Sequence, residues 1–124
     1  MKIEILPQEF AVCKVRGLPQ ELLEKEFVFF SHTDRELSLV CPKSVMPLDC
    51  KTAETGWRGM RIQGQLEFSL IGILAKISTL LAENGISLFA VSTYDTDYFF
   101  VKEERFEKAV QLLNQGGYAL TFMS

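Results

Sequence analysis

The second half of the chain has the clearest pattern of apolar and polar positions. From Leu70 to Leu81, apolar side chains recur every three or four residues, which predicts a helix with one buried face. Ser69 is a favourable N-cap residue for this helix. Asn84-Gly85 predicts its end, because glycine readily adopts the left-handed conformation that terminates many helices.

A second helix is predicted near the C-terminus. Glu103 and Glu104 favour the positive end of its dipole, and Gly116-Gly117 marks its end. The apolar side chains expected on its buried face are Phe106, Val110 and Leu113.

Strands are predicted around both helices from runs rich in apolar and β-branched residues. They cover residues 57–63, 86–92, 98–101 and 118–122. The resulting order, βαββαβ, predicts an α+β, ferredoxin-like fold with an antiparallel sheet and both helices on one face.

The first half predicts a smaller, β-rich unit. Ile3 and Ile5 alternate with polar neighbours and indicate a short strand that Pro7 stops, since proline cannot donate a ladder hydrogen bond. A polar turn between the apolar segments 27–30 and 37–40 predicts a hairpin. The other predicted elements are a strand over residues 10–16, a short helix over residues 20–25 and a linker over residues 51–56.

The two halves share a faint internal repeat. Residues 31–37 align without gaps on residues 92–98, and in each an apolar strand leads to a serine, an acid-bearing turn and another apolar strand. Chance similarity between two hairpins is the alternative. We expect a divergent, smaller unit over residues 1–56 and a complete one over residues 57–124.

The composition is that of a folded protein with a slight acidic excess. Of 124 residues, 48% are apolar and 23% are charged, which fits one compact domain or two small units sharing a core. The net charge of −3 is a poor match for phosphate backbones, so we expect no nucleic-acid binding. The apolar runs are far shorter than the ~20 residues of a membrane-spanning helix, so no membrane partner is expected.

Catalytic and metal-binding chemistry have little support in the sequence. Cys13, Cys41 and Cys50 have no CxxC spacing, and His32 is the one histidine, so neither a zinc cluster nor a disulfide framework is expected. The cysteines are interpreted as reduced thiols of a cytoplasmic protein. His32 lies in a predicted polar turn without a catalytic partner. We therefore expect no cofactor and no enzymatic activity.

One candidate binding cluster lies where the first predicted helix begins. A helix start offers unpaired backbone N–H groups and the positive end of the dipole, which suit a carboxylate. Gly72 has no side chain, so a ligand can approach the backbone closely there. The alternative is that Gly72 only permits tight helix–strand packing, and that Glu67 and Ser69 only cap the helix.

A second candidate cluster is the predicted hairpin over residues 92–98. Asp95 and Asp97, together with neighbouring hydroxyl groups such as that of Thr93, form an acceptor-rich turn that suits an ammonium or guanidinium group. Hairpin turns are also polar for conformational reasons alone, and the spacing favours that alternative, whereas the residue types do not decide between the two.

Residues 57–122 resemble an ACT domain, the small ligand-binding βαββαβ module of amino-acid metabolism. The resemblance is to the branch with the aspartate-kinase regulatory domain and the CASTOR arginine sensors, residues 1–56 being a divergent ACT-like unit. The usual helix entry of this family has a proline between its acid and its glycine. Here Glu67 and Gly72 are present, the proline is absent and the spacing is longer. The segments that carry the resemblance are 70–77, 80–87 and 92–98.

The resemblance implies a non-catalytic regulatory module that binds a small molecule, most simply an amino acid. In related ACT domains the ligand lies at an interface between two units, held by the loop that enters the first helix. On this chain the backbone N–H groups of Ile71 and Gly72 would hold its α-carboxylate. The side chains that would contact its other polar groups are Glu67, Ser69, Thr93, Asp95 and Asp97.

The expected output passes through a regulated enzyme or through a change of oligomer. We expect a homodimer, because ACT-like sheets commonly pair side by side along exposed edge strands. The alternative function is a protein–protein interaction module of the same fold that has lost its ligand. An RNA-binding ferredoxin-like domain is disfavoured by the net charge and by the lack of a basic–aromatic signature.

Overall fold

The computed structural model describes residues 1–63 and 72–123. It divides into two compact units. Unit 1 comprises Met1–Pro7 and the described residues from Arg58 onward, and unit 2 comprises Gln8–Trp57. No helix within the described ranges is long and apolar enough to cross a membrane.

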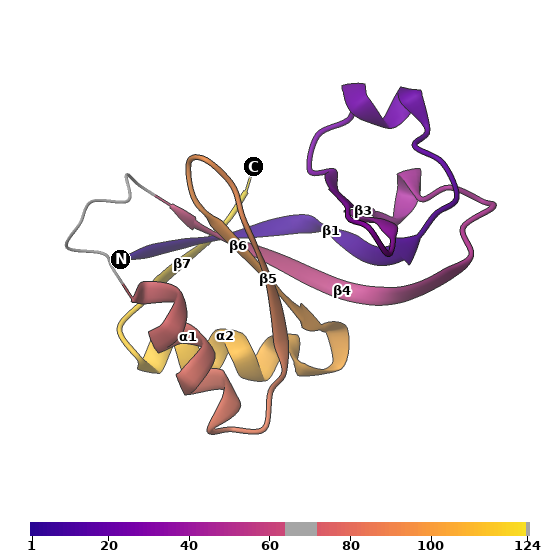
Figure 1. Ribbon diagram of the computed structural model, residues 1–124. Coiled ribbons are helices and arrows are strands. Elements are labelled where there is room, and N and C mark those ends of the chain that lie inside the picture. The colour runs from indigo at the N-terminus through magenta and orange to yellow at the C-terminus, as the bar shows by residue number, and fades with distance from the viewer. Residues whose placement is uncertain (64–71, 124) are drawn as a thin grey trace. The chain divides into compact units, whose positions relative to one another are not determined.

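Unit 1 has the predicted βαββαβ order from β4 to β7, with two helices beneath the strands (Figure 1). The strand order is β7-β1-β4-β6-β5, with β5 and β6 antiparallel. The α+β fold class is therefore confirmed. The elements are β1 (Lys2–Lys14), β4 (Thr52–Gln63), α1 (Ile73–Ala82), β5 (Leu88–Ser92), β6 (Asp97–Lys102), the 3-10 turn η4 (Glu103–Arg105), α2 (Phe106–Gln115) and β7 (Ala119–Phe122).

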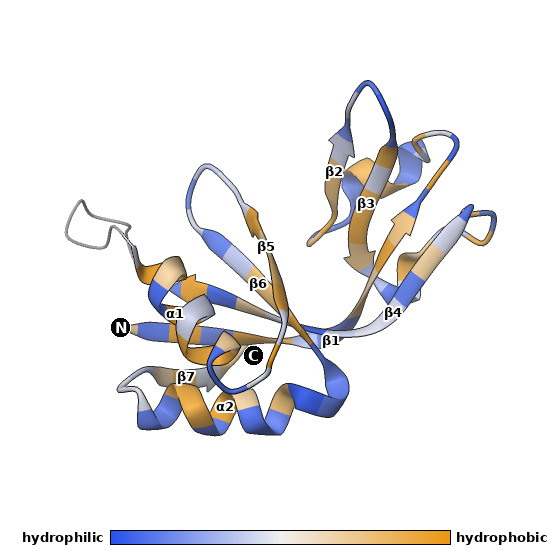
Figure 2. Ribbon diagram, turned by 60° about the horizontal axis from the view of Figure 1, so that its bottom comes forward, coloured by the Kyte–Doolittle hydropathy of each residue, from blue (hydrophilic) through white to orange (hydrophobic). Residues whose placement is uncertain are grey.

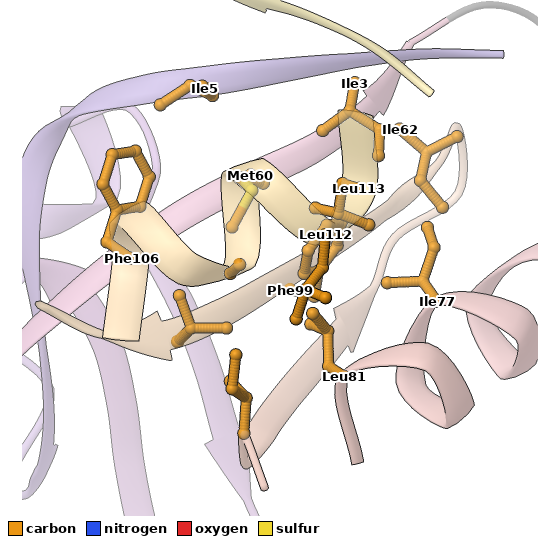
Figure 3. Close-up of a cluster of buried hydrophobic side chains, with 13 residues drawn as sticks. Ile3, Ile5, Met60, Ile62, Ile77, Leu81, Phe99, Phe106, Leu112 and Leu113 are labelled. Atoms are coloured by element: carbon orange, nitrogen blue, oxygen red, sulfur yellow. The ribbon is translucent and has the colours of Figure 1, made fainter. Parts of the chain in front are cut away.

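The core of unit 1 lies between these strands and both helices (Figure 3). Ile77 and Leu81 are four positions apart, so they lie on the same face of α1, and both are fully buried. Phe99 and Val101 alternate along β6 and point to the same face of the sheet. Helical and strand periodicities thus direct apolar side chains into one layer.

Two features of β1 differ from the prediction. The sheet was expected to be antiparallel, but β1 pairs with β7 in parallel, with Ile3 opposite Leu120 and Ile5 opposite Phe122. Pro7 was expected to stop the strand, but β1 continues through it to Lys14. Residues 2–5 pair with β7 and residues 10–14 pair with β3, so Pro7 lies between the two ladders, where its missing N–H removes no bond from either.

Unit 2 is the β-rich half, with strand order β2-β3-β1-β4. Its elements beyond β1 and β4 are the 3-10 turn η1 (Gln20–Glu24), β2 (Phe29–His32), β3 (Leu37–Pro42) and the 3-10 turn η2 (Lys43–Val45). The hairpin and the short helix are confirmed. Figure 2 shows the mostly apolar strand β3 and the hydrophilic turn that joins it to β2, whose second half is polar.

The predicted linker over residues 51–56 is wrong, because β4 begins at Thr52 and runs through it. Thr52 and Thr55 are β-branched and suit an extended backbone. Gly56 has a φ of 81°, and its N–H donates to the Glu9 carboxylate at 2.8 Å. Glycine here accommodates a positive φ within a strand, so it does not indicate a linker between two elements.

The unit boundary falls at Trp57/Arg58, beside the expected one, but residues 1–7 group with the later residues and not with unit 2. The cause is the β1–β7 pairing, which brings Ile3 and Ile5 into the core of unit 1. Sequence order alone could not reveal this, since the pairing joins opposite ends of the chain.

The internal repeat is present, shifted by one residue from the sequence alignment. Strands β3 and β6 begin sixty residues apart, and so do the turns η2 and η4 that follow them. The two hairpins also share their register, with His32 opposite Leu37 and Ser92 opposite Asp97. Thr33 therefore corresponds to Thr93, whereas the sequence alignment had matched Ser31 with Ser92. Because side chains alternate between the two faces of a strand, an alignment that is wrong by one residue matches positions on opposite faces.

We predict that Phe99→Ala lowers the free energy of unfolding by about 3–5 kcal/mol, because it leaves a cavity in a fully buried site. Urea titration followed by circular dichroism measures this loss. Tyr94→Ala is the matched control, since Tyr94 is fully exposed and its loss should change the free energy by less than about 0.5 kcal/mol. Equal effects of the two substitutions would contradict the assigned core.

Candidate functional site

The first candidate cluster is described from Gly72 onward. Gly72 is the N-cap of α1 and has a φ of 87°, and its carbonyl accepts the Lys76 N–H at 2.9 Å. The helix thus begins at Ile73, where its first N–H groups lack intrahelical acceptors. Glu67, Ser69 and Ile71 lie outside the described residues. The predicted Ser69 cap is wrong, because α1 begins at Ile73 and its N-cap is Gly72.

Glycine at position 72 is explained by its backbone conformation. A Cβ added there would meet no described atom within 4 Å, so tight packing against a strand is not the reason for glycine. Its φ lies in the left-handed region, which side chains disfavour. Among the described atoms, the space beside the start of α1 is therefore open on the glycine side.

The second candidate cluster is a closed turn between β5 and β6. The Thr93 N–H donates to the Thr96 carbonyl at 2.8 Å. The Thr93 hydroxyl donates to the same carbonyl at 3.0 Å and accepts the Thr96 N–H at 3.3 Å. The Thr93 hydroxyl therefore stabilises the conformation of the turn, as expected if the hairpin is polar for conformational reasons.

Thr96 fixes this turn to the neighbouring strand. Its hydroxyl donates to the Ile62 carbonyl on β4 at 2.6 Å, and the residue is only 7% exposed. Sequence analysis did not single out Thr96, because nothing in the local pattern distinguishes a buried hydroxyl from an exposed one in a turn. The contact holds the hairpin on the rest of unit 1.

The two carboxylates of the hairpin differ in their surroundings. Asp97 is partly buried, and its Oδ1 accepts the Ser92 hydroxyl at 2.6 Å across the strand pair. Asp95 is exposed at the turn. The structure brings Thr93, Asp95 and Asp97 into one hairpin, but no hydrogen bond or ion pair between described residues joins them to Gly72.

A charged cluster that sequence analysis missed lies beside the hairpin. Arg61 on β4 donates to Glu4 on β1 through Nε at 3.1 Å and to the Tyr98 hydroxyl on β6 at 3.3 Å. Partial burial lowers the pKa of Arg61, but the hydrogen bonds to Tyr98 and Glu4 outweigh it, so the pKa is raised. The sequence signal for this cluster was the alternation of side chains along a strand. Glu4, Arg61 and Tyr98 each stand next to a buried core residue, so their side chains point to the opposite face of the sheet.

The described residues give no metal-binding arrangement. They contain no group of three or more His, Cys, Asp or Glu side chains placed to hold an ion. His32, the one histidine, is exposed at the end of β2. The described part of the candidate site consists of the start of α1 at Gly72 and the oxygen-rich turn between β5 and β6. Both suit the polar and charged groups of a small ligand.

We predict that Thr96→Val destabilises the protein by about 1–3 kcal/mol, because the buried Ile62 carbonyl loses its hydroxyl donor. Thr96→Ser retains the hydroxyl and should recover most of the loss. Thermal or urea unfolding measures both variants. A valine variant as stable as the wild type would contradict the anchoring role.

Comparison with known proteins identifies one family. The sequence model described as ACT domain matches residues 52–115. No curated protein matches the chain.

Solved structures similar to this chain span nearly all of it. Protein Atu0741 from Agobacterium tumefaciens is 31% identical, with a TM-score of 0.89 over 99% of this chain and 93% of that one. VC0802 from Vibrio cholerae, a protein of unknown function, is 25% identical, with a TM-score of 0.70 over 92% and 88%. The regulatory subunit of aspartate kinase from Thermus thermophilus shares the fold at 12% identity, with a TM-score of 0.58 over 87% and 92%.

Proposed function

The chain belongs to the ACT domain family, and on that premise we propose that it binds an amino acid at the start of α1 and the β5–β6 hairpin. ACT domains are regulatory modules and not catalytic ones. The observation that carries the proposal is Gly72, which opens α1 with a positive φ and open space beside it among the described atoms. An anion at that position would meet the positive end of the helix dipole.

The proposed contacts follow the charges of an amino acid. The N–H groups of Ile71 and Gly72 hold the α-carboxylate, and Glu67 or Asp97 faces the α-ammonium group. Ser69 or Thr93 adds a neutral hydrogen bond, and Asp95 is available to a polar ligand side chain.

The described hairpin supports part of this arrangement. The Ser92 bond occupies Oδ1 of Asp97 and orients the carboxylate, whose remaining acceptor sites stay available to an ammonium group. The Thr93 hydroxyl already donates and accepts within the turn, which weakens any hydrogen bond that it makes to the ligand.

We predict that Gly72→Asp weakens amino-acid binding at least about tenfold, because a fixed negative charge would repel the ligand carboxylate. Calorimetric titration with each of the twenty amino acids measures binding to the wild type and the variant. Gly72→Asn is the matched control, because it has the same shape without the charge and asparagine tolerates a positive φ.

Three outcomes of the titration bear on the proposal. Binding that survives in the asparagine variant and fails in the aspartate variant supports the carboxylate site. Equal saturable binding to all three proteins removes Gly72 from the site. If no amino acid binds, and none raises the unfolding free energy by the ~2.7 kcal/mol expected at 100 times its Kd, the chain is an interaction module without a ligand.

The proposed output is a change in association with a second copy or with a regulated enzyme. Strand β5 is at the end of the strand order in unit 1, so one of its edges has no strand partner among the described residues. An unpaired edge is a template for side-by-side pairing of two sheets. The three free thiols fit a reducing compartment, and we assign the protein to the cytoplasm on that basis.

We predict a homodimer in sedimentation velocity, strengthened by the bound amino acid. Ala90→Lys places a charge on the exposed middle of β5 and should shift the protein toward monomer. Leu48→Lys, at a fully exposed position of unit 2, is the control and should leave the dimer intact. A wild type that stays monomeric at high concentration with ligand present would contradict this assembly.

A further inference from the structure

Unit 2 gathers all three cysteines of the chain around one small core. Cys13 and Cys41 are buried members of this core, and Cys50 packs against it while partly exposed. In the β1–β3 ladder Ala11 is opposite Cys41 and Cys13 is opposite Leu39. Residues directly opposite share a face, so Cys13 and Cys41 are diagonal neighbours on the same side of the sheet.

A backbone hydrogen bond places Cys50 beside the end of β1. The Lys51 N–H donates to the Lys14 carbonyl at 2.8 Å, so Cys50 lies near the end of β1, and it packs against the core that contains Cys13. The thiols of both Cys41 and Cys50 contribute to the shift in the pKa of Cys13, so Cys13 interacts with each of them. Cys13 is therefore the central thiol of the three.

The three thiols differ in access and in acidity. Cys41 is fully buried and Cys13 is 3% exposed, whereas Cys50 is only partly buried. Burial raises the pKa of Cys41 to about 12 and also raises the pKa of Cys13, so both are protonated at neutral pH. An oxidant in solution thus reaches Cys50 first, because the thiolate is the reactive form and access limits the other two.

We propose that Cys50 and Cys13 form a reversible oxidation site, in which a hydroperoxide attacks Cys50 and Cys13 closes an intramolecular disulfide. The inference rests on the thiol cluster alone and is independent of the proposed amino-acid site. Cys41 remains a thiol, because it is fully buried and the Lys51 contact holds Cys50 near the end of β1, the strand that carries Cys13.

The chemistry proceeds in two balanced steps. The Cys50 thiolate attacks the peroxide, an S–O bond forms as the O–O bond breaks, and the released alkoxide or hydroxide takes up a proton. Cys50 is oxidised to a sulfenic acid and the peroxide is reduced. The Cys13 sulfur then attacks the Cys50 sulfur, an S–S bond replaces the S–O bond, and the hydroxyl group leaves as water with the Cys13 proton.

Peptide mapping tests the proposal directly on the full chain. Lysine and arginine positions place each cysteine in its own tryptic peptide, namely residues 3–14, 36–43 and 44–51. After hydrogen peroxide treatment of the native protein, denaturation and alkylation, we expect peptide 3–14 linked to peptide 44–51. Peptide 36–43 should be recovered alkylated, and dithiothreitol should release the linked pair.

Two variants make the assignment specific. Cys50→Ser should lose the disulfide completely, and Cys41→Ser should still form it, which separates a directed pair from random oxidation of neighbouring thiols. Linkage through peptide 36–43, linkage of Cys50 to a second chain, or oxidation of Cys50 beyond the sulfenic acid without a disulfide would overturn the proposal. The wild-type map decides these outcomes even where a variant fails to fold.

Discussion

Strand β1 is the element on which both units depend. Its residues 2–5 pair with β7 and supply Ile3 and Ile5 to the core of unit 1. Residues 10–14 pair with β3 and supply Cys13 to the core of unit 2. One uninterrupted strand thus completes two hydrophobic cores, and the exposed Pro7 is accommodated because it lies where the ladder partner changes.

The sequence predicts local elements well because their signals are local. Both helices and their glycine ends, such as Gly85 with its φ of 75°, follow from apolar spacing and backbone preference. The insertion of β1 beside β7 was not predictable in this way, since the partners lie at opposite ends of the chain.

The candidate site shows the same division between local and long-range information. Gly72 was singled out for its lack of a side chain, and the structure gives the specific reason, a positive φ at a helix N-cap. Thr93 was assigned to a ligand, yet its hydroxyl closes the turn. Thr96 and Arg61 were missed because their partners come from other strands, which no spacing within one segment reveals.

The repeat explains why one unit alone carries the proposed site. Thr33 closes the turn of unit 2 by accepting the N–H groups of Arg35 and Glu36, much as Thr93 closes its counterpart. The residue sixty positions before Gly72 is Val12, which lies within β1, so unit 2 has no helix start at the corresponding place. The Thr33 turn of unit 2 therefore has the polar residues but no helix N-terminus beside it. It serves as an internal control for the proposed ligand binding at the Thr93 hairpin.

Amide chemical shifts of the nitrogen-15-labelled full chain, recorded while each amino acid is added, test the central claim most directly. The account predicts that one amino acid shifts the Gly72 amide and the amides of the Thr93 hairpin in a saturable manner, while the Thr33 turn stays unchanged. Saturable shifts confined to other parts of the chain, or equal shifts in both turns, would contradict it.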